Sequence, residues 1–247
     1  MIKFFRKIRQ NLLSEGKTRK YLKYAIGEIV LVVIGILIAL QINNWNEDRK
    51  SEAKKQDYYV QLLDDLNSDI ISAQNTIEEF SNHQKEYNDY ISSYNNESLT
   101  PVKAYGDISK LSLISTPPIF NTNTIEALQN SGDIGLIPSS IRNKLMNLGR
   151  LQNLTIQRFE VTDTGQRGIT QKLSSLLGAT TLPKRLENQP EMKKFLNIDE
   201  NLRELILVYE GIHRWKSVSQ LETIDRLEKM QKEIDTIITL IKKELKK

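Results

Sequence analysis

One uninterrupted apolar stretch, residues 29–40, stands out near the start of the chain. A helix over residues 24–45 would be about 31 Å long, at ~1.5 Å per residue, and the hydrocarbon core of a bilayer is about 30 Å thick. Tyr21, Tyr24 and Trp45 fall at the two ends of this segment, and amphipathic rings prefer the membrane–water interface. The pattern therefore predicts a transmembrane helix over residues 24–45, anchored at its interfaces by these three aromatic residues.

A cleaved signal peptide and a buried core helix are the alternatives for this segment. The residues after Leu40 are Gln-Ile-Asn-Asn-Trp, which lack the small-x-small pattern of a cleavage site. A core helix would not need so long an apolar run with interface-type aromatic residues at both ends. Both features favour an uncleaved span, and the lipid bilayer is then the first partner of the chain.

A line of small and polar residues runs along one face of the predicted span. Projected at 100° per residue, Glu28, Gly35, Ala39 and Asn46 fall within about 20° of one line. Gly35-x-x-x-Ala39 is a small-xxx-small pair, which lets another helix approach closely. We expect Glu28, Gly35 and Ala39 to pack against a second helix in a homo- or hetero-oligomer. The alternative is a lone span, on which the carboxylate of Glu28 reaches the headgroup water.

Beyond the span, apolar residues recur in alternating steps of four and three, which is the heptad pattern of packed helices. The first run comprises Leu66, Ile70, Ala73, Ile77, Phe80, Gln84, Tyr87, Ile91 and Tyr94. The second run comprises Leu227, Met230, Ile234, Ile237, Ile241 and Leu245. All six prolines lie between Pro101 and Pro190, so no proline interrupts either run. The pattern predicts two long helices, over about residues 46–94 and 199–246.

The middle of the chain carries the signals of shorter helices. Asn123 precedes Glu126 by three residues, as in a capping box, and Gly132 is placed to end the helix that starts there. A third helix is expected from Pro138, a suitable residue for a first turn. Its apolar residues are Ile141, Leu145, Leu148, Leu151, Leu154 and Ile156.

These elements predict an all-α fold, with one N-terminal transmembrane helix followed by a helical bundle of long antiparallel helices. Shorter helices are expected at one end of the bundle, and Gly165 and Gly168 are expected to break or bend the third helix. The alternative is a parallel dimeric coiled coil that rises from the membrane. Intramolecular packing is favoured because Tyr, Phe and Gln recur at core positions, where a tight dimer prefers Leu, Ile and Val.

The distribution of charge assigns the two sides of the membrane. The net charge of the chain is +4, yet residues 1–23 hold eight Lys and Arg against Glu15 alone. By the positive-inside rule, residues 1–23 form a basic cytoplasmic tail and residues 46–247 form a periplasmic helical domain. The expected location is the inner (cytoplasmic) membrane, crossed once. Nucleic acid is not expected as a partner, because the basic charge is confined to the tail.

Few residues suggest chemistry. The chain contains no cysteine, which excludes disulfides, thiolate nucleophiles and Cys-ligated metals. His83 and His213 would approach each other if the long helices are antiparallel, but they lack the H-x-x-x-H spacing of metal sites. We therefore predict no catalytic residue, no cofactor and no metal ligand. The loop at residues 113–124, LISTPPIFNTNT, either lines a pocket for an unknown small molecule with Tyr105 and Trp215 or crosses over to cap the core.

Two stretches of the chain are RKYLKYAIGEIVLVVIGILIALQINNWNE and, downstream, LQNSGDIGLIPSSIRNKL. Together they resemble an uncharacterised family of Bacteroidota membrane proteins, catalogued as a domain of unknown function. The resemblance is dense over residues 1–60 and weaker over residues 122–150. It implies a single N-terminal span and a helical domain facing the periplasm, and it implies no activity, ligand or catalytic residue.

The leading hypothesis is a membrane-anchored periplasmic module that binds or scaffolds an unknown partner protein. The alternative is a periplasmic solute-sensing bundle. A sensor would have to signal through a partner protein, because a cytoplasmic tail of about 23 residues is too short for an output domain. An enzyme would need a nucleophile, a base and an orienting group in one constellation, and the sequence suggests none, so enzymatic activity is not expected.

Overall fold

The computed structural model describes four stretches of the chain, residues 18–95, 98–179, 181–196 and 201–246. These stretches are helical almost throughout and contain no strand, which confirms the predicted all-α fold. The chain divides into two units, residues 1–57 and residues 58–247. Most of the predicted basic tail, residues 1–17, lies outside the described residues.

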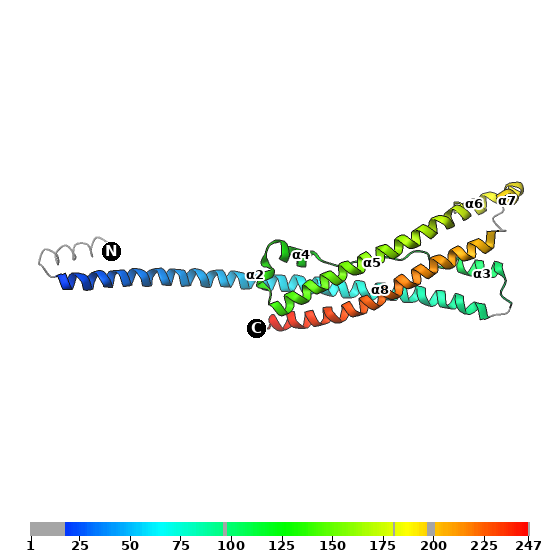
Figure 1. The fold of residues 1–247 in the computed structure, drawn as a ribbon. Helices are drawn as coiled ribbons and strands as arrows, with labels where there is room; N and C mark the ends of the chain where they lie inside the picture. The colour runs from blue at the N-terminus through cyan, green and yellow to red at the C-terminus, as the bar shows by residue number, and fades with distance from the viewer. Residues whose placement is uncertain (1–17, 96–97, 180, 197–200, 247) are drawn as a thin grey trace. The chain divides into compact units, whose positions relative to one another are not determined.

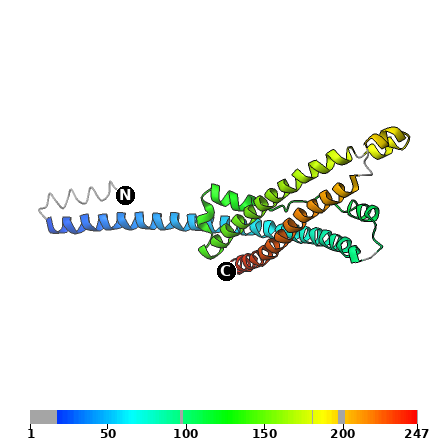
Figure 2. The same ribbon diagram turned by 45° about the vertical axis from the view of Figure 1, so that its right-hand side comes forward.

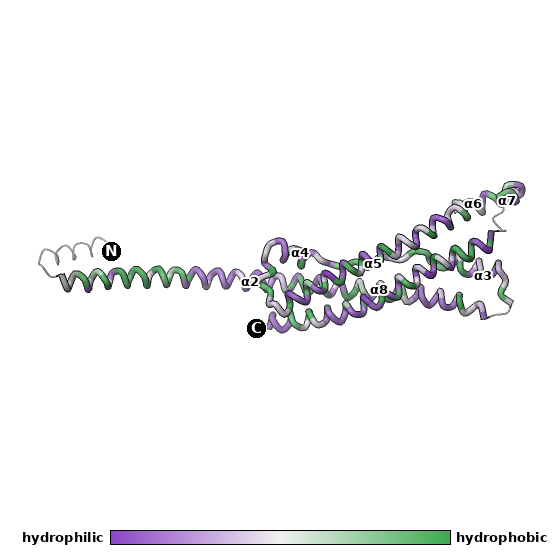
Figure 3. Tube along the Cα trace, viewed as in Figure 1, coloured by the Kyte–Doolittle hydropathy of each residue, from purple (hydrophilic) through white to green (hydrophobic). Residues whose placement is uncertain are grey.

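The longest helix, α2 (Thr18–Ser92), contains the apolar stretch in its first part. Among the described residues this is the one helix long and apolar enough to cross a membrane, and Figure 3 shows its apolar part in green. None of this apolar window is buried. The sequence pattern suggested a separate helix from about residue 46. The helix instead continues without a break, because neither proline nor glycine occurs between Gly35 and Ser92.

Two further long helices, α5 (Ser139–Leu177) and α8 (Leu202–Glu244), build the second unit together with α2 from Tyr58 onward (Figure 1). Cross-helix pairs give the directions. The ammonium of Lys144 contacts Glu233, and farther along α5 the ammonium of Lys172 contacts Glu204, so α5 and α8 are antiparallel. The predicted bundle of long antiparallel helices is therefore confirmed.

The helices α2 and α5 run in the same direction. The side chain of Asp69 bonds to Gln152, and the ring of Phe80 stacks on Phe159 with centroids 6.1 Å apart. Two consecutive parallel helices need a return connection, and the chain makes it with an extended segment between α3 (Pro101–Ile108) and α4 (Asn123–Asn130). Figures 1 and 2 both show this segment running back along the bundle.

The short helices lie at both ends of the bundle, whereas the sequence analysis expected them at one end. Helix α4 and the 3₁₀ turn η2 (Asp133–Leu136) pack near the start of α5. Helix α3 packs on α8, and α6 (Leu182–Leu186) and α7 (Pro190–Leu196) follow the end of α5 (Figure 2). The 3₁₀ turn η1 (Ser93–Asn95) ends the first long helix.

Two hydrophobic clusters form the core of the second unit. The first cluster joins α2, α4, α5 and α8, and its buried residues are Tyr59, Leu62, Leu66, Ala73, Ile125, Leu128, Ile137, Ile141, Leu145, Leu148, Leu227, Met230, Ile234, Ile237, Ile238 and Ile241. The second cluster joins α2, α3, α5 and α8, and its buried residues are Tyr90, Ile108, Leu173, Leu205, Val208, Tyr209 and Ile212. The heptad residues of the last helix are thus buried within the same chain.

Gly132 confirms the predicted end of the short helix α4. It has φ 77°, in the left-handed region that glycine adopts without strain, and it follows the C-cap residue Ser131. The start differs by one residue from the expectation, because Thr122 rather than Asn123 is the N-cap. The hydroxyl of Thr122 donates to the carboxylate of Glu126 at 2.6 Å, and this bond closes the first turn.

Gly165 and Gly168 were expected to break or bend the third helix, and they do not break it, because α5 continues through both residues to Leu177. A glycine inside a helix costs about 1 kcal/mol relative to alanine, which a helix of 39 residues packed on two neighbours tolerates. Gly165 has a packing reason as well. A Cβ atom there would lie 3.3 Å from the ring of Trp215, so the glycine lets α8 place an indole against α5.

Candidate functional site

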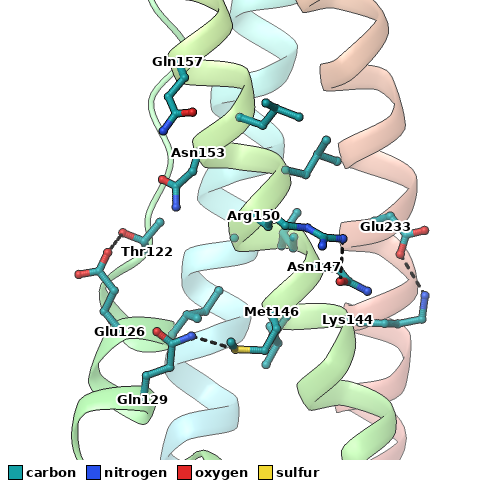
Figure 4. Close-up of a pocket in the computed structure, with 16 residues that line it drawn as sticks. Thr122, Glu126, Gln129, Lys144, Met146, Asn147, Arg150, Asn153, Gln157 and Glu233 are labelled. Carbon is teal, nitrogen blue, oxygen red and sulfur yellow. Dashed lines mark hydrogen bonds and ion pairs between the residues drawn. The ribbon is translucent and has the colours of Figure 1, made fainter.

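A groove of about 1010 Å³ crosses the outer face of α5, between α4 on one side and α8 on the other (Figure 4). Gly149 lies in its floor, and a Cβ atom at this glycine would meet no atom within 4 Å. Helix α4 contributes the side chains of Glu126 and Gln129, and α8 contributes Glu233. The groove is therefore open to solvent and shaped by a missing side chain on α5.

The lining of the groove combines amides, two partly exposed apolar side chains and one arginine. Gln129, Asn147, Asn153 and Gln157 supply the amides. Met146 and Leu154 are 44% and 45% exposed. Leu154 is one of the apolar residues that predicted this helix, but α5 turns Gln152, Thr155 and Phe159 inward instead. Amides can donate and accept at once, so such a surface suits a polar backbone better than an apolar ligand.

Four charged side chains line the groove, and among the described residues only Lys144 and Glu233 pair with each other. The ammonium of Lys144 lies 3.0 Å from Glu233, and Glu126 accepts the hydroxyl of Thr122. The guanidinium of Arg150 donates to the side-chain oxygen of Asn147 at 3.3 Å and has no acidic partner among the described residues. Its remaining donors can bind a carboxylate from outside the chain.

We call residues 109–122, which connect α3 to α4, the crossover strap. The loop at residues 113–124 forms most of this strap and the first two residues of α4. It lies extended along the bundle, and the helices bind its backbone with side chains. The amide of Gln166 donates to the carbonyl of Leu113, and the ammonium of Lys216 donates to the carbonyl of Ser112. The hydroxyl of Ser72 donates to the carbonyl of Ile119 at 2.8 Å. These bonds satisfy a backbone that has no secondary structure of its own.

Two carboxylates of α2 hold the other end of the strap. Asp69, 1% exposed, accepts the backbone N–H of Asn121 at 2.7 Å and an amide N–H of Gln152 at 2.7 Å. Asp65 accepts the backbone N–H of Thr124 at 3.2 Å and so caps α4. Burial raises the pKa of Asp69 to about 6, although both of these hydrogen bonds oppose the rise. Sequence patterning did not predict this role, because the backbone partners of Asp69 and Asp65 lie 52 and 59 residues away in the chain.

A small cavity of about 10 Å³, the room of one water molecule, lies between α2, the strap and α8. His83, His213 and Lys216 line it, which confirms that the two histidines approach each other. His213 is 3% exposed, and its Nε2 atom has no hydrogen-bond partner among the described residues. The side-chain N–H of Gln220 lies 3.0 Å from Nδ1 of His83 and donates to it when His83 is in the tautomer with its proton on Nε2.

Burial disfavours the charged forms of His213, Lys216 and His83. It lowers the pKa of His213 to about 4, with a further contribution from the positive charge of Lys216. It lowers the pKa of Lys216 itself to about 8, against the attraction of Glu86 and Glu79. The pKa of His83 is also lowered by burial. The imidazoles therefore act at neutral pH as uncharged parts of the polar layer that surrounds the strap.

Tyr105 and Trp215 do not join the strap in a pocket. Neither residue lines the groove of Figure 4 or the small cavity. Tyr105 packs against the ring of Tyr209 edge to face, with centroids 6.1 Å apart, and so belongs to the second cluster. Trp215 is 43% exposed and lies over Gly165. The strap is thus a structural crossover at this point, which was one of the two alternatives.

The predicted membrane residues lie on the first part of α2. Gly35 and Ala39 are exposed, and a Cβ atom at Gly35 would meet no atom within 4 Å. Glu28 is half-buried. Tyr21 and Tyr24 belong to the helix, but their side chains lie outside the part of the chain that the structure describes. The ring of Trp45 is 64% exposed, and the guanidinium of Arg49 lies 5.7 Å from its centroid. Packing between spans and anchoring at the interfaces stay predictions.

Within the residues that the structure describes, no group of three or more His, Asp or Glu is placed to hold a metal ion.

Comparison with known proteins assigns the chain to a family. No curated protein and no solved structure matches the chain. One family model, described as a family of unknown function (DUF6090), matches residues 28–178. This match covers more than half of the chain and includes the apolar stretch, the strap and α5, and the chain therefore belongs to the DUF6090 family.

Proposed function

We propose that this protein is a single-span protein of the bacterial inner membrane whose exported helical bundle binds other proteins. The apolar part of α2 is long enough to span a bilayer, and the excess of Lys and Arg in residues 1–23 supports a cytoplasmic N-terminus. Residues 46–247 would then lie in the periplasm. An origin in Bacteroidota and contacts between spans through Glu28, Gly35 and Ala39 belong to the same proposal.

The groove on α5 carries the proposal of a binding function. An extended peptide segment fits its chemistry, because the amides of Asn153 and Gln157 can pair with both the N–H and C=O groups of a peptide backbone. Arg150 offers a charged donor for an acidic side chain of that segment. Met146 and Leu154 supply apolar contacts beside it. The occupant that we propose is thus an extended, acidic segment of a partner protein.

The strap shows the same chemistry inside the bundle. There, an amide of α5 (Gln166) and an ammonium of α8 (Lys216) hold the carbonyls of an extended segment. The proposed partner segment would meet amides and a cation of the opposite face of α5 in a similar way. This internal example supports the proposal that the bundle recognises extended backbone through side-chain donors.

The small cavity favours the binding module over the sensing alternative. Its volume of about 10 Å³ suits one water molecule, and even a small solute needs a site many times larger. The groove on α5 is large but open, which suits a chain segment more than an enclosed solute. Serine and histidine side chains line the small cavity, but the hydroxyl of Ser217 donates to Gln84 at 2.7 Å rather than to a histidine, so this cavity gives no support to enzymatic activity. The lining of the groove contains no histidine.

Photo-crosslinking in native membranes tests the proposal. A photoreactive amino acid replaces Asn153 in the full chain, and crosslinked proteins are identified by mass spectrometry. We expect discrete adducts when the photoreactive amino acid is at position 153. We expect none when it replaces Lys229, which is exposed on α8. Gly149→Leu should abolish the adducts, because it fills the floor of the groove and improves the helix.

Gly168→Leu is the matched control, since Gly168 lies on the same helix with equally open space around it. This variant should keep all adducts. Arg150→Glu should remove the adducts, as Gly149→Leu does, because a glutamate at this position would repel an acidic segment. Only free monomer at Asn153, or adducts that survive Gly149→Leu, would overturn the proposed function.

A further inference from the structure

The tip of the bundle, which we define as α6 and α7 with their connection (residues 182–196), presents an apolar face that the described residues leave uncovered. On α7, Met192, Phe195 and Leu196 follow one another at the spacing i, i+3, i+4 and therefore share one side of the helix. Lys193 and Lys194 lie on the other side. The helix is thus amphipathic over its whole length.

The apolar face of the tip is exposed to an unusual degree. Phe195 is 82% exposed, Met192 is 49% exposed and Leu196 is 38% exposed. No residue of α7 is buried. A single exposed apolar side chain is ordinary, but three on one face of a short helix form a patch that a binding partner commonly covers.

The tip carries an excess of positive charge. Lys184 and Arg185 lie in the last turn of α6, and Lys193 and Lys194 lie in the last turn of α7. The same segment contains two acids, Glu187 and Glu191, so the tip carries two more positive than negative charges. A partner that covers the apolar face will therefore be favoured if its surface is negative.

We propose that the tip docks on an anionic lipid surface, with Phe195 and Met192 inserted among the acyl chains and the lysines among the headgroups. Phe and Leu on one face with Lys on the other is the composition of helices that lie in the membrane interface. The cores of protein interfaces are instead depleted of lysine, which argues against a protein or a second copy as the occupant. A short helix binds lipid weakly, and the attraction of its neighbouring cations for anionic headgroups adds to the insertion of the apolar side chains.

This inference concerns a different surface from the groove on α5, and the two can fail separately. The chain lacks cysteine, so Leu196→Cys provides one attachment point for an NBD fluorophore. The labelled full chain is placed in nanodiscs of phosphatidylcholine. Separate vesicles are then added, made either of phosphatidylcholine or of equal parts of phosphatidylcholine and phosphatidylglycerol.

We expect co-flotation with the anionic vesicles and a blue shift of the NBD emission, and much less of both with phosphatidylcholine. Exchanging Phe195 and Met192 together for serine, read by flotation of the unlabelled chain, should lower vesicle binding about tenfold or more. Lys193→Gln with Lys194→Gln should reduce the preference for anionic vesicles and its sensitivity to salt. Because all four residues are outside the core, none of these changes should alter the helical content.

Two exposed residues outside the tip provide the matched control. Val161→Ser with Leu221→Ser removes a similar apolar surface and should leave vesicle binding unchanged. Gly149→Leu should also leave it unchanged, although it blocks the groove. Equal binding to both kinds of vesicle, or full binding by the Phe195 and Met192 double variant, would overturn the inference. A blue shift without vesicles that grows with protein concentration would assign the tip to a second copy instead.

Discussion

The two hydrophobic clusters of the bundle are stabilised in different ways. Apart from Tyr59, the buried side chains of the first cluster are aliphatic or methionine, and they need only a close fit. The second cluster contains Tyr90 and Tyr209 and packs against Tyr87 and Tyr105, whose hydroxyls must find partners. Glu210 supplies one acceptor for two of them, at 2.9 Å from Tyr87 and 2.8 Å from Tyr90. One end of the bundle thus depends on shape, and the other depends on a few hydrogen bonds.

A polar layer separates the two clusters, and it exists because of the strap. The amide of Gln84 on α2 donates to Gln220 on α8 at 2.8 Å, and Gln220 donates in turn to Ser115 of the strap at 3.0 Å. Removing both partners of such a bond can be harmless, but removing one leaves a buried group unpaired. The comparison of the two clusters therefore leads to experiments that separate packing from hydrogen bonding.

The largest effect is expected in the first cluster. Leu145→Ala should lower the free energy of unfolding by about 2–5 kcal/mol, because Leu145 is fully buried and its truncation leaves a cavity. Leu154→Ala on the same helix should change it by less than about 0.5 kcal/mol, since Leu154 is 45% exposed. Urea denaturation of the full chain in detergent, followed by circular dichroism, measures both. Equal effects would contradict the assignment of the inward face of α5.

The carboxylate that holds the strap should have the next largest effect. Asp69→Ala should destabilise the chain by about 1–3 kcal/mol, because the N–H of Asn121 and the amide of Gln152 lose their acceptor. Asp69→Asn should be neutral or stabilising at pH 7. It removes a buried charge, and rotation of the Gln152 amide would give its unpaired Oε1 atom a donor.

The dependence of stability on pH checks the same residue. The pKa of Asp69 is raised to about 6 in the fold, so the charged carboxylate is penalised above pH 6 and the penalty disappears as the pH falls toward 4. The wild type should therefore gain up to about 3 kcal/mol relative to Asp69→Asn over this window. A constant difference between the two proteins from pH 7 to pH 4 would show that Asp69 is not buried as a charge.

Glu210 tests the second cluster. Glu210→Gln should cost about 1–2 kcal/mol, because the hydroxyls of Tyr87 and Tyr90 lose a charged acceptor. Hydrogen exchange should show the loss mainly in α3 and the adjoining turns of α8, with the first cluster still protected. Glu204→Gln is the control, since its pair with Lys172 is half-exposed and contributes less than about 1 kcal/mol. Loss of protection at both ends would mean that the clusters unfold as one.

The smallest effects are expected where α5 passes between the clusters. Gly168→Ala should stabilise the chain by about 0.5–1 kcal/mol, because its new methyl group meets open space and alanine favours the helix. Gly165→Ala should gain less, since its methyl group would press on the ring of Trp215. Thermal unfolding of the two variants side by side measures the difference. A larger gain at Gly165 would show that the indole moves away freely.

The heptad pattern predicted most of the core of α8, because a helix with one buried face repeats its apolar residues every three or four positions. It was less accurate on the other two long helices. Tyr90 is buried where Ile91 was expected, and Ile91 is 47% exposed. Near that end α2 packs on α3 and α8 through tyrosines, whose hydroxyls reach Glu210, and this partner lies 120 residues away in the sequence. Local periodicity contains no information about such a bond.

The sequence by itself determined the apolar stretch, the all-α fold, the long helices and the left-handed end of α4 at Gly132. Each of these follows from the properties of a few neighbouring residues, such as hydropathy, proline placement and glycine conformation. Only the tertiary structure decided that α2 and α5 are parallel, that Asp65 and Asp69 hold the strap, and that Gly149 opens a groove. These features depend on which helices meet, and that is set by packing among residues far apart in the chain.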